Sequence, residues 1–71
     1  MTLTRRKVKQ LAKTFIQDVY RFGINDAINS IDYGTWKQFK FNAELLEEFE
    51  SSISDVMYKP EVFRFVNSLR K

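Results

Sequence analysis

Residues 8–22, VKQLAKTFIQDVYRF, carry the clearest indication of the fold class in this chain. The apolar residues of this stretch recur at intervals of three and four, the period of an α-helix with one buried face. Thr2 or Thr4 can cap the start of this helix, and Gly23 follows it where a glycine commonly ends one. The pattern predicts an amphipathic helix over residues 4–22. Its buried stripe consists of Val8, Leu11, Ala12, Phe15, Ile16, Val19 and Phe22.

Two more segments have helical spacing of apolar residues. A stripe of Ile and Ala within residues 24–31 predicts a short helix over about 26–32, capped by Asn25. A second stripe, beginning at Leu45, predicts a long helix over 43–57 that is capped by Asn42.

A last helix is predicted at the C-terminal end of the chain. Pro60 suits the first position of a helix, so this helix should cover about 60–70. Its expected stripe does not include Phe65 and consists of Val62, Phe63, Val66 and Leu69.

Residues 35–41, TWKQFKF, are ambiguous between helix, strand and loop. The Thr, Trp and Phe side chains favour a strand, whereas Thr35 and Gln38 match a capping box that starts a helix. A single strand would have no partner in this chain, so we expect a short helical turn or an ordered loop. Tyr33 and Gly34 are expected to break the chain before this segment.

Together these segments predict an all-α fold, a small bundle of three to four helices that forms a single helical domain over residues 1–71. We expect the helices at 4–22 and 43–57 to pack antiparallel, with residues 26–41 as the crossover between them. Because a chain this short buries a small core, a homodimer is an alternative way to cover apolar surface.

Several function classes are disfavoured by composition. The chain has neither cysteine nor histidine, so we expect no metal site and none of the usual catalytic triads, and no cofactor motif is present. No apolar run is long enough to span a membrane, and no apolar stretch follows the basic N-terminus as in a secretory signal; a cytoplasmic protein is expected. Four glutamates are interpreted as a solvated face rather than an acid–base pair, so no enzyme is predicted: Glu44, Glu47, Glu48 and Glu50.

Charge is segregated along the chain, whose net charge is +3. Residues 1–17 carry five bases and no acid, whereas residues 41–58 carry five acids and no base. The exposed side of the first helix is therefore a candidate binding face, with Arg5, Arg6, Lys9 and Lys13 as its residues. It could contact nucleic-acid phosphate, an acidic protein, anionic lipid, or the chain's own acidic segment.

A further hypothesis is a helix-turn-helix over residues 25–50, in which Lys37, Gln38 and Lys40 would contact bases. The glutamates that follow at 44–50 would repel phosphate, which argues against it.

The aromatic residues Trp36, Phe39 and Phe41 are the candidate hydrophobic anchor for a partner protein, although a small core could also absorb them. These features favour a non-enzymatic small regulator, adaptor or inhibitor that acts by protein–protein interaction, with a homodimer as one possible form. The alternative is a nucleic-acid-binding regulator that uses the basic N-terminal helix. No motif identifies a family.

Overall fold

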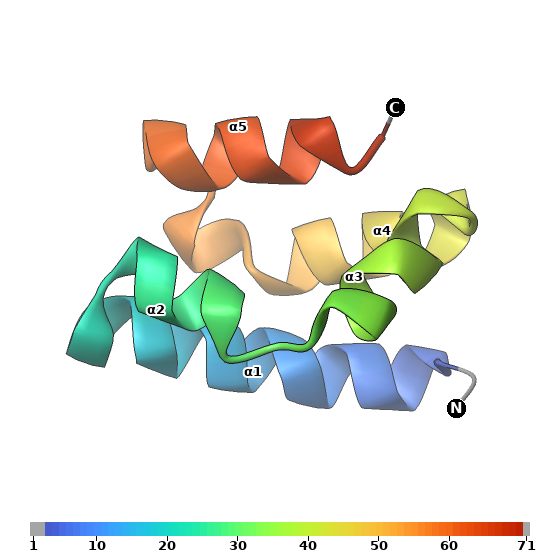
Figure 1. Cartoon of the computed structure of the whole chain (residues 1–71), viewed down its shortest axis with the longest axis horizontal. Coiled ribbons are helices and arrows are strands. Elements are labelled where there is room, and N and C mark those ends of the chain that lie inside the picture. The colour runs from blue at the N-terminus through green and yellow to red at the C-terminus, as the bar shows by residue number, and fades with distance from the viewer. Residues whose placement is uncertain (1–2, 71) are drawn as a thin grey trace.

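The computed structural model describes residues 3–70 as five α-helices and one short 3₁₀-helix, with no strand in that range (Figure 1). The predicted all-α helical bundle is confirmed, with five α-helices in the described range where three to four were predicted. Residues 1, 2 and 71, and with them the alternative cap Thr2, lie outside the described range. No helix between residues 3 and 70 combines the length and the apolar character needed to cross a membrane. The elements are α1 (Arg5–Phe22), α2 (Ile24–Asn29), α3 (Tyr33–Lys40), α4 (Ala43–Ser52), η1 (Ser54–Val56) and α5 (Pro60–Ser68).

The bounds of α1 agree with the prediction because both of its ends are capped. The side chain of Thr4 accepts a hydrogen bond from the backbone N–H of Lys7 at 3.2 Å. At the other end Gly23 adopts a φ of 99°, a region that favours glycine. The Gly23 carbonyl then accepts from the N–H of Ala27 at 3.1 Å, so α2 starts at once. The predicted cap at Asn25 is therefore wrong, because Asn25 already lies inside α2.

Helix α3 occupies the segment that the sequence left ambiguous. The prediction that Tyr33 and Gly34 break the chain is wrong, because they form the first turn of this helix, which Asp32 precedes. The inner face of α3 carries Trp36 and Phe39, both buried. An isolated helix of eight residues is unstable, so α3 owes its conformation to this packing.

The long helix predicted over 43–57 is interrupted. Helix α4 ends at Ser52, and Ile53 leaves the helical conformation with φ −103° and ψ 22°. The next turn is tighter, since the N–H of Val56 donates to the carbonyl of Ile53 at 2.9 Å. Ile53 and Val56 are nevertheless fully buried, so the apolar spacing continues across the break and conceals it.

Helices α1 and α4 run parallel, and the predicted antiparallel packing is wrong. Both run from right to left in Figure 1, and the side chain of Arg5 lies 3.7 Å from that of Glu44, which places the two helix starts together. The reason is the crossover. Because α2 and α3 lead the chain back along α1, α4 begins beside the start of α1, and α5 then returns in the opposite direction above α4.

Trp36 lies at the centre of an aromatic core. Its ring centroid lies between 4.8 and 6.2 Å from those of four phenylalanine rings, one each from α1, α3, α4 and α5. Its indole N–H also donates a hydrogen bond to the carbonyl of Ile28 at 3.0 Å. Trp36 therefore joins every α-helix of the bundle. The four rings belong to Phe15, Phe39, Phe49 and Phe65.

Two phenylalanines predicted for the core are exposed instead. Phe22 is the last residue of α1, where the chain turns away at Gly23, and more than half of its surface is open to solvent. Phe63 is exposed because α5 is rotated so that Phe65, expected off the stripe, packs against Trp36. Val62, Val66 and Leu69 are buried as predicted.

Candidate functional site: the basic face of helix α1

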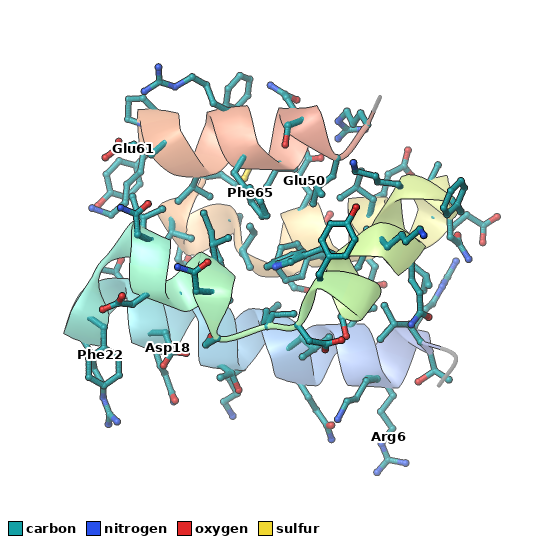
Figure 2. All side chains as sticks on the ribbon, viewed as in Figure 1. Arg6, Asp18, Phe22, Glu50, Glu61 and Phe65 are labelled. Carbon is teal, nitrogen blue, oxygen red and sulfur yellow. The ribbon has the colours of Figure 1, made fainter. Side chains whose placement is uncertain are left out.

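The outward side of α1 forms a strip of positive charge that we call the basic face, made of Arg6, Lys9, Lys13 and Arg21 with Arg5 at its edge. All five side chains are exposed. They lie opposite the buried stripe of α1, and Figure 2 shows Arg6 directed away from the rest of the molecule. From position 6 to position 21 the strip extends about 22 Å along the helix.

The chain neutralises little of the basic face. Within residues 3–70, the only ion pair made by α1 joins Arg5 and Glu44, at 3.7 Å, and both side chains are well exposed. Such a surface pair contributes about 0–1 kcal/mol. The second ion pair lies elsewhere, between Arg70 and Glu50. The acidic segment of the chain thus contacts the edge of the basic face and leaves Arg6, Lys9 and Lys13 free of acidic partners in the described part of the chain.

The position of these bases is also locally unfavourable. The first turn of α1 contains no acidic residue, although the positive end of the helix dipole lies there. Arg5, Arg6 and Lys7 therefore add like charge to an already positive helix end. An external anion would relieve this repulsion, which makes the start of α1 the most strongly attracting part of the face.

The prediction from the sequence included only part of this site. Arg21 lies four residues beyond Gln17, which itself follows Lys13 by four, so all three share one stripe of the helix. Tyr20 is an exposed aromatic side chain on the same outward side. Continuing the spacing rule past Gln17 would have identified Arg21 from the sequence.

The predicted aromatic anchor is divided by the fold. Trp36 and Phe39 are 6 % and 1 % exposed, so they belong to the core, and the prediction of an exposed three-residue anchor is wrong for them. Both lie on the inner face of α3, where they contact Phe49 of α4. Phe41, in contrast, is 81 % exposed just beyond the end of α3. Tyr33 is also exposed, at the start of α3.

The three side chains proposed to contact bases in a helix-turn-helix do not share one exposed surface. Lys37 and Lys40 are exposed on α3, but Gln38 is half-buried and its side-chain oxygen accepts from the backbone N–H of Leu3 at 2.9 Å. That hydrogen bond ties α3 to the residues that precede α1 and commits the oxygen of Gln38 to the fold.

The glutamates of α4 lie on its outer side and at its flank. Glu48 accepts a hydrogen bond from the hydroxyl of Ser52 at 3.3 Å, and Glu50 pairs with Arg70. Between residues 3 and 70, no three acidic side chains gather in an arrangement that could hold a metal ion. The acid whose pKa departs clearly from its ordinary value is Asp32, where a hydrogen bond from the hydroxyl of Thr35, at 2.6 Å, lowers the pKa.

Comparison of the chain with protein-family models, with curated proteins and with solved structures found no match.

Proposed function

We propose that this protein is a non-enzymatic binding protein that places the basic face of α1 on the phosphate backbone of a nucleic acid. One observation carries the proposal: five exposed bases share one side of α1, and only Arg5 among them has an acidic partner within residues 3–70. Phosphate contact is the interaction that such a strip of unpaired Lys and Arg favours.

The arrangement of the bases supports contact with a repeating anion. Arg6, Lys9 and Lys13 are three and four residues apart, so the Cβ atoms of neighbouring bases lie about 5–6 Å from each other along the helix surface. An extended row of this kind can meet several consecutive phosphates at once. Neutralising about four phosphates would give a slope of log K against log salt near −4.

The test compares two triple variants with the same net charge. One removes the basic face: Arg6→Ala, Lys9→Ala and Lys13→Ala. Its matched control removes three exposed bases from α3 and α5: Lys37→Ala, Lys40→Ala and Arg64→Ala. Binding to fluorescent duplex DNA, duplex RNA and single-stranded DNA is measured by anisotropy between 50 and 200 mM salt.

We expect the basic-face variant to lose most of its affinity. The slope of log K against log salt should become shallower by about 3, because three phosphate contacts are lost. The control should retain the slope of the parent protein. Equal losses in the two variants would show that net charge alone attracts the nucleic acid. Such a result, or no binding by the parent at 50 mM salt, contradicts the proposal.

A second candidate function is docking to another protein, which the exposed aromatic residues Phe41 and Tyr33 favour. Interfaces are enriched in such side chains. If the partner is a second copy of this chain, the mass measured by light scattering should rise with concentration. The Phe41→Ser variant should then remain monomeric, whereas Phe22→Ser, which changes an exposed phenylalanine at the end of α1, should associate like the parent.

A further inference from the structure

A groove on the surface lies between α3 and the end of α5, on a different part of the molecule from the basic face. Its volume is about 400 Å³. Exposed residues on α3 and α5 border it, so it is open to solvent. Its apolar lining consists of Ile28, Ile31, Tyr33, Trp36, Phe65 and Leu69.

The charges around this groove are asymmetric. Lys37 and Lys40 border it along α3, and neither pairs with an acid in the described part of the chain. The acid in the lining, Asp32, lies at the opposite end of α3 from Lys40, and its carboxylate accepts a hydrogen bond from the hydroxyl of Thr35. The end of the groove near Lys40 is therefore cationic.

An apolar floor with a cationic border fits an acidic amphipathic helix. The apolar side chains of such a helix would cover Tyr33 and the edge of Trp36, and its carboxylates would reach Lys37 and Lys40. A single-chain lipid would leave much of its surface in water, because the groove is open. Phosphate would gain nothing from the apolar floor.

A second copy of this chain is a poor occupant. The acidic helix of the chain is α4, and its apolar residues Leu45, Leu46 and Phe49 are buried in its own core. Another copy cannot offer them to the groove without unfolding. The occupant must therefore bring its own apolar and acidic side chains.

We propose that the groove between α3 and α5 binds an acidic amphipathic helix of a partner protein, with the carboxylates of the partner held by Lys37 and Lys40. This interaction uses a surface separate from the basic face of α1, so it does not depend on nucleic-acid binding.

Trp36 provides a direct measurement. It is the only tryptophan of the chain and lines the groove, so its fluorescence reports on an occupant. The probe is a synthetic 14-residue helical peptide with leucine at positions 2, 6, 9 and 13 and glutamate along both flanks of that stripe. Two control peptides are a scrambled sequence of the same composition and a version with lysine in place of glutamate.

The probe should change the emission of Trp36 saturably, and both control peptides should bind at least tenfold more weakly, because they lose the apolar stripe or the charge match. The double variant Lys37→Glu and Lys40→Glu should raise the Kd of the probe about tenfold. The milder Lys37→Gln and Lys40→Gln variant should raise it less. The matched control, Lys9→Glu with Lys13→Glu on α1, should leave the Kd within about twofold, since neither residue lines the groove and salt screens exposed charges that are not in contact with the probe.

Four results would overturn the proposal. The first two concern the peptides: no response to the probe at millimolar concentration, or binding of the scrambled peptide as tight as that of the probe. The third is an equal effect of the two charge-reversed variants on the Kd, and the fourth is a response to oleate or to single-stranded DNA that is stronger than the response to the probe. Circular dichroism of each variant confirms that it is folded before binding is measured. Loss of nucleic-acid binding by the basic-face variant has no bearing on these outcomes, so the two proposals fail separately.

Discussion

Replacing Trp36 by alanine should remove a large part of the stability of this protein, because one side chain connects all five α-helices. The Trp36 ring contacts Phe15 of α1, Phe49 of α4 and Phe65 of α5, with centroid distances of 6.2, 5.6 and 4.8 Å. Its indole N–H donates a hydrogen bond to the carbonyl of Ile28 in α2 at 3.0 Å. The substitution removes all of these contacts at once.

The expected loss is comparable with the whole stability of the domain. Truncating a buried tryptophan to alanine costs about 3–5 kcal/mol, and the lost hydrogen bond adds about 1 kcal/mol. A domain of 71 residues is stabilised by only about 4–10 kcal/mol in total. Trp36→Phe keeps one aromatic ring in the site and loses the hydrogen bond and part of the volume, so we expect a loss of about 1–2 kcal/mol.

Urea unfolding followed by circular dichroism at 222 nm measures both variants without relying on tryptophan fluorescence. With a slope near 1 kcal/mol per M, Trp36→Phe should lower the urea midpoint by about 1–2 M. Trp36→Ala should lower the urea midpoint by about 4–6 M, which leaves the variant unfolded in water if the midpoint of the parent protein is below that value. Phe41→Ala is the matched aromatic control, because Phe41 is exposed, and it should change stability by less than about 0.5 kcal/mol.

A Trp36→Ala variant as stable as the parent protein would refute this reasoning. If its helical signal and urea midpoint matched those of the parent protein, Trp36 could not be the centre of the core. The prediction from the sequence that Trp36 is an anchor for a partner protein would then regain support. A loss caused equally by Phe41→Ala would be just as damaging, because it would show that exposure does not predict the cost.

Two further predictions concern the backbone turn after α1 and the acid before α3. Gly23→Ala should lower the free energy of unfolding by about 1–3 kcal/mol, because Gly23 has a φ of 99° that only glycine adopts readily; Gly34→Ala, in a helix, should cost clearly less in the same urea assay. The hydrogen bond from Thr35 lowers the pKa of Asp32 below its ordinary 3.8 in the folded protein, so its contribution is present above that pH and is lost as the pH falls through the folded pKa. Asp32→Asn and Thr35→Val should therefore each reduce the difference in urea midpoint between pH 7 and pH 2.5, and an unchanged difference in both variants would exclude this linkage.

Local patterns in the sequence predicted the parts of the fold that local forces decide. The stripe within residues 8–22 and the caps at Thr4 and Gly23 set the bounds of α1, since periodicity and capping act within a few residues of one another. Asn42 was predicted as the cap of α4, and its side chain accepts from the N–H of Leu45 at 3.2 Å. The basic face also follows from spacing alone, because the side of a helix opposite its buried stripe must be exposed.

Periodicity did not reveal features that depend on contacts between distant residues. Ile53 and Val56 keep the apolar spacing of a continuous helix, so the end of α4 at Ser52 was concealed. Phe63 and Phe65 are two residues apart in one helix, and only the packing of Phe65 against Trp36 decides which of them is covered. The short α3 was ambiguous for the same reason, since its conformation depends on the core beneath it.

The amino-acid pattern was enough to predict that the fold is all-α, where the longest helix begins and ends, and that charge is segregated along the chain. Tertiary structure alone decided that α4 runs parallel to α1, which brings Arg5 to Glu44 and leaves the remaining bases of α1 without acidic partners among the described residues. An apolar stripe specifies which side of a helix is buried, but it carries no information about direction. Direction depends on the path of the connection, and here α2 and α3 lead the chain back to its starting end before α4 begins.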